Sequence, residues 1–175
     1  MIREILDAQN PILRQKSKPV RKIDKKVKSI IKDLVDTLEA QIDPEGVGLA
    51  APQIGKNITV FIMKPKNEIK VIINPEIIKI RHIQKKKSQD PKKNIMEGCL
   101  SLPHYYSPIK RALKVTLKYL DLNGQEKIED FFKIEAQIIQ HEVDHLKGEL
   151  FVDRILEQKK PLYEYIDGEW EEVEI

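Results

Sequence analysis

Apolar and polar positions alternate most regularly in residues 112–122, ALKVTLKYLDL. Apolar side chains occupy every second position from Leu113 to Tyr119, and lysine or threonine stands between them. Because successive side chains of a β-strand point to opposite faces, this pattern predicts a strand with one buried face. Asn123 and Gly124 then favour a tight turn, after which QEKIEDFFKI is predicted to return as the second strand of a hairpin.

Two other stretches have helical periodicity instead. Residues 24–42 place apolar side chains three and four positions apart, with Asp24 as a candidate N-cap and Pro44 just beyond the end. This predicts an N-terminal amphipathic helix. Residues 135–147 have a second such pattern, and Gly148 follows where a C-cap glycine is expected.

Shorter β-branched runs complete the predicted fold. NITVFIM and IKVII are typical of strands, and LYEYIDGEWEEVEI at the C-terminus predicts a hairpin or tail over residues 161–175, with its turn at Asp167 and Gly168. Together the patterns predict an α+β fold, in which a mainly antiparallel β-sheet packs around the 135–147 helix. Since no repeat or linker divides the chain, residues 1–175 are expected to form a single domain.

Composition narrows the class of protein. Lys and Arg number 31 against 28 Asp and Glu, so the net charge of +3 is too small to indicate nucleic-acid binding by itself. The single cysteine, Cys99, cannot form an internal disulfide, and the N-terminus lacks the apolar run of a signal peptide. No stretch reaches the roughly 18 apolar residues of a membrane span. We therefore expect a cytoplasmic protein with no membrane or DNA partner.

Candidate chemistry lies in the predicted helix, in QHEVDHLKG at residues 140–148. His141 and His145 are four apart, so their ring nitrogens project from one side and can converge on a metal ion. Glu142, one position round, can accept a proton from a water held by that metal without ligating it. The competing interpretation is that the two histidines have this spacing by chance, because the HExxH pattern fixes only three positions.

A catalytic metal site usually has three protein ligands, so the two histidines leave a third to be found. Downstream of His145 the candidates are Glu149, Asp153 and Glu157, none of them distinctive, and an ion pair or a helix cap explains Asp153 equally well. Upstream, Cys99 in EGCLSLP can supply a thiolate, although a lone intracellular cysteine is more often a small buried apolar residue. The spacing alone leaves these alternatives open.

Three motifs in order make the chain similar to the peptide deformylases: GVGLAAPQIG at 46–55, EGCLSLP at 97–103 and QHEVDHLKG at 140–148. The resemblance also covers VIINPEI and ELFVDRI, and so spans most of residues 5–156. It implies a metal-dependent hydrolase that removes the N-formyl group from N-formylmethionine of newly synthesised polypeptides and releases formate. A general HExxH metallopeptidase and a catalytically silent, ribosome-associated metal-binding module are the alternatives.

The resemblance also implies the metal site. Cys99, His141 and His145 match the three ligands of one divalent ion per chain, and Glu142 matches the general acid and base. Fe²⁺ is the ion that the resemblance implies in the cell, while Zn²⁺, Ni²⁺ or Co²⁺ can occupy the same ligands.

Substrate contacts are implied in the same way. The side-chain amide of Gln53 and the backbone N–H of Leu100 match the donors that hydrogen-bond the formyl oxygen as it becomes an oxyanion. Val47 and Gly48 match positions beside the substrate, and Glu97 lies near the pocket for the methionine side chain. Helix geometry, and not motif matching, adds Ile134 and Ile138, which lie on the same side of the predicted helix as the histidines. These two residues are either part of the core or the apolar wall of this pocket.

The chain departs from the family pattern at two places. The basic segment 79–94, KIRHIQKKKSQDPKKN, replaces a shorter and often acidic connection, and is expected to be an insertion. A solvated loop is the first interpretation, before a flap beside the cleft or a contact with ribosomal RNA. The acidic C-terminus stands where many bacterial members have a basic helix for ribosome docking, so transient ribosome contact by that route is in doubt. No role is carried over to Tyr105 and Tyr106.

Overall fold

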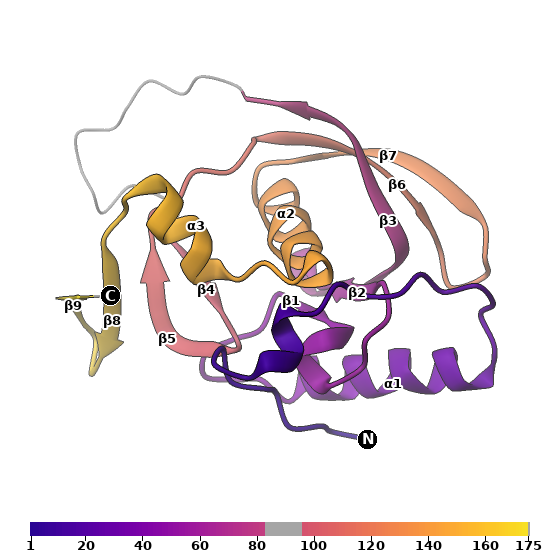
Figure 1. Cartoon of the computed structure of the whole chain (residues 1–175), viewed down its shortest axis with the longest axis horizontal. Coiled ribbons are helices and arrows are strands. Elements are labelled where there is room, and N and C mark those ends of the chain that lie inside the picture. Colours follow the sequence, from indigo (N-terminus) through magenta and orange to yellow (C-terminus); the bar gives the residue numbers. More distant parts are fainter. Residues whose placement is uncertain (83–95, 175) are drawn as a thin grey trace.

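The computed structural model describes residues 1–82 and 96–174, which form an α+β fold with antiparallel sheets (Figure 1). The predicted insertion at 79–94 falls largely outside these residues, and 79–81 belong to a strand instead of a loop. Within the described residues, no helix has the length and apolar character that crossing a membrane requires. The elements are the 3-10 helices Pro11–Arg14, Ala51–Ile54 and Pro65–Asn67, the α-helices α1 (Lys25–Glu39), α2 (Ile134–Lys147) and α3 (Phe151–Gln158), and the strands β1 (Gly48–Ala50), β2 (Val60–Met63), β3 (Lys70–Arg81), β4 (Glu97–Cys99), β5 (Leu102–Ser107), β6 (Lys114–Leu120), β7 (Glu126–Phe132), β8 (Leu162–Ile166) and β9 (Glu169–Val173).

The larger sheet has five strands in the order β1-β2-β3-β6-β7, all paired antiparallel. In β6 the alternating side chains Val115, Leu117 and Tyr119 are buried, as the alternating pattern predicts. Gly124, with a φ of 77°, lies in the turn that joins β6 to β7. This sheet is therefore a continuous antiparallel surface on which helices can pack.

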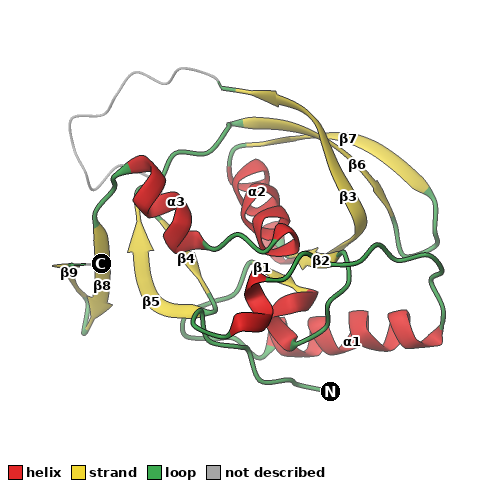
Figure 2. Cartoon of the chain, in the orientation of Figure 1, coloured by secondary structure: helices red, strands yellow, loops and turns green. Residues whose placement is uncertain are grey.

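The smaller sheet has four strands in the order β4-β5-β8-β9. Its strands β8 and β9 pair across the turn at Asp167 and Gly168. The sequence patterns lead us to expect one main sheet, whereas the structure divides the strands between two, with β4 and β5 contributed by the EGCLSLP region. Figure 2 shows the two sheets on either side of α2.

Helix α1 packs on one face of the larger sheet. Asp24 caps it, because its carboxylate accepts a hydrogen bond from the backbone N–H of Val27 at 2.9 Å. The apolar side of the helix, including Leu34 and Leu38, is buried against Leu49 and other residues of β1, β2 and β3. One layer of core thus holds β1, and the loop before it, in place.

Helix α2 packs on the opposite face. Ala136, Ile139, Val143 and Leu146 contact a second core cluster that includes side chains of β2, β3, β6 and β7. Gly148, with a φ of 79°, ends the helix as a left-handed C-cap. Because this apolar stripe faces the sheet, the helix is held rigidly, with another side turned towards β4.

Candidate active site

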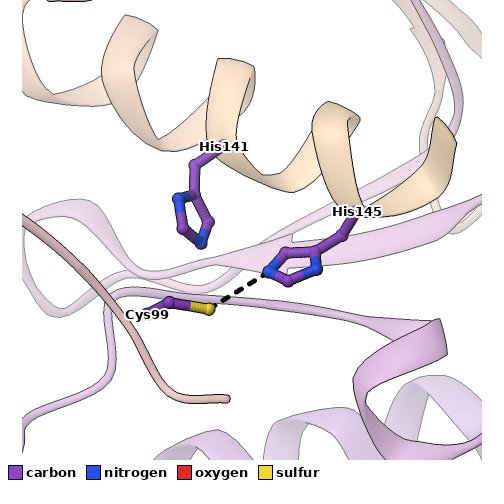
Figure 3. Close-up of side chains that lie close together, drawn as sticks. All are labelled: Cys99, His141 and His145. Atoms are coloured by element: carbon purple, nitrogen blue, oxygen red, sulfur yellow. Dashed lines mark hydrogen bonds between the residues drawn. The ribbon is translucent and has the colours of Figure 1, made fainter. Parts of the chain in front are cut away.

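Three potential metal donors converge where α2 meets the end of β4. The ligand atoms of Cys99, His141 and His145 all lie within 4.8 Å of one another. The two histidines project from successive turns of α2, and Cys99 ends β4 at a point where the β4–β5 register shifts (Figure 3). The Cys99 Sγ atom lies 3.2 Å from Nε2 of His145. The spacing of the histidines therefore does produce a cluster, and its third member is the cysteine.

The donor set suits a divalent transition metal. A thiolate and two imidazoles are the ligands that Zn²⁺ and Fe²⁺ accept readily. Burial opposes ionisation of the Cys99 thiol, but the neighbouring His145 and His141 rings outweigh it and hold the pKa of Cys99 well below its ordinary value. His141 and His145 are themselves buried. The cluster thus offers an anionic sulfur and two ring nitrogens in one protected place.

The downstream carboxylates are engaged elsewhere. Asp153 pairs with Arg14 at 2.5 Å and accepts a hydrogen bond from the backbone N–H of Leu150 at 2.7 Å. Glu149 and Glu157 both pair with Arg154. None of the three belongs to the cluster, which leaves Cys99 as the third donor.

Glu142 lies beside the cluster in a buried position. One of its carboxylate oxygens, Oε2, has no hydrogen-bond partner among residues 1–82 and 96–174. Burial raises the pKa of Glu142 to about 7, so the side chain can both take and return a proton near neutral pH. The backbone of Gly48 comes so close that a Cβ there would lie 2.4 Å from Glu142 Oε1.

Gln53 presents its amide NH₂ group to the same place. Its Oε1 accepts a hydrogen bond from the backbone N–H of Ala50 at 2.8 Å, and this contact orients the side chain. Its Nε2 lies 3.2 Å from the Ser101 hydroxyl and 3.8 Å from Cys99 Sγ. A buried donor is therefore fixed next to the three metal-binding candidates.

A cleft opens from this cluster. The predicted substrate residues Val47, Gly48, Glu97 and Ile138 all line it, together with Gln53, Leu100 and Glu142. Ile134, Tyr105 and Tyr106 also line the cleft. The structure thus brings these motif residues to one concave surface together with Cys99 and His141, while His145 lies behind them in the metal-binding cluster.

Glu97 lines the cleft, near the predicted methionine pocket, and has a further set of partners behind it. Its carboxylate is turned to His141 and Arg111. Oε1 lies 2.8 Å from His141 Nδ1 and 2.7 Å from Arg111 Nη2, and Oε2 lies 3.0 Å from Arg111 Nε. Burial opposes its ionisation, but His141 and Arg111 outweigh it and lower the pKa of Glu97 to about 2. A fixed carboxylate therefore holds the His141 ring.

Sequence reasoning missed the ion-pair network that continues behind Glu97. Arg111 also contacts Asp144 at 2.6 Å, and Arg154 reaches both oxygens of Asp144 at 2.9 and 2.8 Å. One signal for this network was available: Asp144 lies on the helix between the two histidines, where a buried carboxylate requires a cation.

Comparisons with known proteins agree with this arrangement. A family model described as polypeptide deformylase matches residues 2–161. The peptide deformylase of Pseudothermotoga lettingae is 42% identical over 89% of this chain and 84% of its own length. That of Dictyoglomus thermophilum is 40% identical over 90% of this chain and 95% of its own length.

Solved structures give the same result. The peptide deformylase of Thermotoga maritima superposes with a TM-score of 0.77 at 35% identity, covering 88% of this chain and 97% of that protein. A peptide deformylase of Legionella pneumophila superposes with a TM-score of 0.75 at 39% identity, covering 88% of this chain and 86% of that protein. With a matching family model, close relatives and a shared fold, the chain belongs to the polypeptide deformylase family.

Proposed function

We propose that Cys99, His141 and His145 hold one divalent metal ion, and that the cleft above them is where a formyl amide is hydrolysed. As a member of its family, the chain is a hydrolase that removes the N-formyl group from N-formylmethionine of newly synthesised polypeptides and releases formate. The observation that carries the assignment of the site is the convergence of one thiol and two imidazoles within 4.8 Å.

The metal would supply Lewis-acid chemistry: when bound it polarises the amide carbonyl and lowers the pKa of a coordinated water to about 7. The proposed ion in the cell is Fe²⁺, with Zn²⁺, Ni²⁺ and Co²⁺ able to use the same ligands. Helix α2 would be the central helix that carries the HExxH motif, and the amphipathic helix α1 would support β1 from behind.

Proton transfer is assigned to Glu142. Its unpartnered Oε2 is available to accept a proton from the water that attacks the formyl carbon. A pKa of about 7 then allows the same carboxyl to return that proton to the departing amine. Because burial is what raises the pKa, the closed surroundings of Glu142 are part of its function.

Charge stabilisation is assigned to Gln53 and the backbone N–H of Leu100. As the formyl carbon becomes tetrahedral, negative charge develops on its oxygen, and both groups would donate hydrogen bonds to it. The contact between Gln53 Oε1 and the Ala50 N–H supports this role, since the amide is oriented before substrate arrives. Removal of one such donor typically lowers the rate by about 100-fold or more.

Substrate binding is assigned to the apolar wall of the cleft. Ile138 is buried beside Gly48 and Val47, and these residues would receive the methionine side chain. Glu97 lines the same cleft, and its contact with His141 Nδ1 supports a second role, the orientation of that ring. Residues 1–175 would act as one catalytic domain, in the cytoplasm and on nascent chains, with transient contact to the ribosome.

The test is formate release from formyl-Met-Ala-Ser, with bound metal quantified on the same sample. Glu142→Gln should abolish turnover and keep the metal, whereas Glu135→Gln, on the same helix but away from the cluster, should retain both. If Glu142→Gln still releases formate at the wild-type rate, the assignment of the proton-transfer group is wrong. Cleavage of internal bonds in an unformylated peptide would instead favour a general metallopeptidase.

A further inference from the structure

The C-terminal hairpin extends the smaller sheet beyond the part of the chain that matches the family. The match ends at residue 161, and β8 begins at Leu162. Strand β8 pairs with β5, so that Tyr106 lies opposite Tyr163, and β9 forms the outer edge (Figure 1). The hairpin therefore adds two strands directly to the strand that lines the cleft.

The two faces of this extension differ in chemistry. One face packs Leu162 and Val173 against Phe151 and Ile155 of α3. Since partners across a sheet share a face, the register places four aromatic side chains on the opposite face. These residues, here called the aromatic face, are Tyr106, Tyr163, Tyr165 and Trp170.

The aromatic face is ordered by its own contacts and remains open to solvent. The Trp170 ring lies edge-on to Tyr106, with centroids 5.3 Å apart, and 4.7 Å from the Tyr165 ring. Yet Trp170 is 48% exposed and Tyr165 is 40% exposed. Rigid aromatic surface of this kind binds other groups at a low cost in side-chain entropy.

Tyr106 connects the aromatic face to the cleft. It lines the cleft with Gly98, and its ring lies so close to Gly98 that a Cβ there would be 2.7 Å from it. Gly98 immediately precedes Cys99. The aromatic face thus begins at Tyr106, against the residue that precedes a proposed metal ligand, and extends outwards over β5, β8 and β9.

Among the described residues, the carboxylates of Glu172, Asp43 and Glu45 lie near the aromatic face or the adjoining cleft. Glu172 lies on the same face as Tyr163, and burial together with the nearby Asp43 carboxylate raises the pKa of the Tyr106 hydroxyl. Glu45 lies on the cleft lining, which includes no Lys or Arg among the described residues. Such surroundings repel phosphate and favour apolar or basic peptide side chains, the basic ones through cation–π contacts and nearby carboxylates.

From these observations we infer that the aromatic face binds the formylated polypeptide downstream of its first residues, with a preference for apolar and basic side chains. The inference rests on the proposed function. From β4 to β9 there are three strand spacings, roughly 14 Å, which an extended peptide covers in about four or five residues. A tripeptide substrate would therefore not span the aromatic face out to β9, whereas a heptapeptide would.

The first experiment compares kcat/KM for formyl-Met-Ala-Ser and formyl-Met-Ala-Ser-Lys-Leu-Lys-Leu. Trp170→Ala should lower the value for the heptapeptide roughly 3- to 10-fold, mainly through KM, because one aromatic contact is lost. The value for the tripeptide should not change. Phe132→Ala is the matched control, since Phe132 is equally exposed, at 48%, but lies on the other sheet.

The second readout uses the fact that Trp170 is the only tryptophan in the chain. In Glu142→Gln protein, the heptapeptide should change the Trp170 fluorescence and the tripeptide should not. A heptapeptide with Glu in place of Lys should bind more weakly. Unchanged fluorescence together with an unchanged heptapeptide kcat/KM in Trp170→Ala would overturn the inference, whereas failure of the wild type to deformylate the tripeptide would overturn the proposed function itself.

Discussion

The Nδ1 atom of His141 lies 2.8 Å from Oε1 of Glu97, and Arg111 holds that carboxylate through two further hydrogen bonds. With Nδ1 engaged by a fixed carboxylate, the Nε2 side of the ring is left for the cluster with Cys99 and His145. A ring held in this way keeps one tautomer and one orientation. Glu97 therefore acts on the proposed metal centre without belonging to it.

Replacement of Glu97 by Gln is expected to weaken metal binding by about 10- to 100-fold, the usual effect of losing the carboxylate behind a histidine ligand. The amide keeps the shape but loses the charge that pairs with Arg111. Competition with a coloured chelator measures the dissociation constant for Zn²⁺ or Co²⁺ directly. Glu135→Gln is the control on α2, and equal affinities for the two variants would rule out the positioning role.

Replacement of Arg111 is expected to affect the free energy of unfolding more than substrate binding. Its side chain is 8% exposed and it pairs with Glu97 at 2.7 Å and with Asp144 at 2.6 Å. Arg111→Met leaves both buried carboxylates without this cation, which typically costs about 3–5 kcal/mol. Urea unfolding measures the loss. Arg14→Met, which breaks the half-exposed pair with Asp153, should cost less than about 1 kcal/mol.

Local periodicity predicts the elements that are amphipathic by themselves. Strand β6 alternates with a period of two, and α1 repeats its apolar residues at helical spacing with Asp24 as its cap. The histidine pair follows from the same geometry, since residues four apart on α2 share a side. In each case the partners that decide the structure are only a few residues away in the chain.

The remaining features depend on contacts between distant segments. Strand β3 continues through Pro75 to Arg81, because the pairing with β6 shifts register between Ile73 and Glu76 and the side chain of Asn74 bonds to the backbone of Val20. The short helix α3 likewise begins without a favoured cap residue. The pairing of Arg111 with Glu97 links segments 14 residues apart. Periodicity carries no information about such partners.

Gly48 is expected to tolerate no side chain. A Cβ there would lie 2.4 Å from Glu142 Oε1 and 2.9 Å from Ile138 Cγ2, so Gly48→Ala must displace the proposed proton-transfer group. We expect the rate of formate release to fall by about 100-fold or more, the lower range of general acid–base contributions, with the metal retained.

A second glycine of the same motif provides the comparison. A Cβ at Gly46 would meet Leu38 at 2.6 Å and Leu100 at 3.0 Å, but not Glu142. Gly46→Ala should therefore strain the packing and lower the unfolding free energy with a smaller effect on turnover. If both variants lose turnover equally at equal stability, displacement of Glu142 is not the cause.

The acid dependence of stability is predicted at a site far from the cleft. The Lys70 ammonium, 2.9 Å away, holds the pKa of Glu129 below its ordinary value of 4.5 against an opposing effect of burial. Because the folded-state pKa is the lower one, the contribution of Glu129 is present above pH 4.5 and is lost as the pH falls through the folded-state value. Glu129→Gln should cost about 0.5 kcal/mol at pH 7, and urea unfolding near pH 3 should show little difference between variant and wild type. A difference that grows towards low pH would contradict the assignment.

Metal removal is expected to lower thermal stability through Cys99. A ligand that binds only the folded chain adds about 2.7 kcal/mol at 100 times its Kd, and a domain of this size gains about 2–4 °C in Tm for each kcal/mol. Chelation should therefore lower the Tm of the loaded protein by roughly 5–10 °C. Cys99→Ser replaces the thiolate by a weak hydroxyl ligand, so its Tm should hardly respond to the chelator. His104→Gln is the control, since His104 lines the cleft outside the cluster and its loss should leave the metal-dependent shift intact. A full shift in Cys99→Ser would mean that the two histidines bind the ion with some other third ligand.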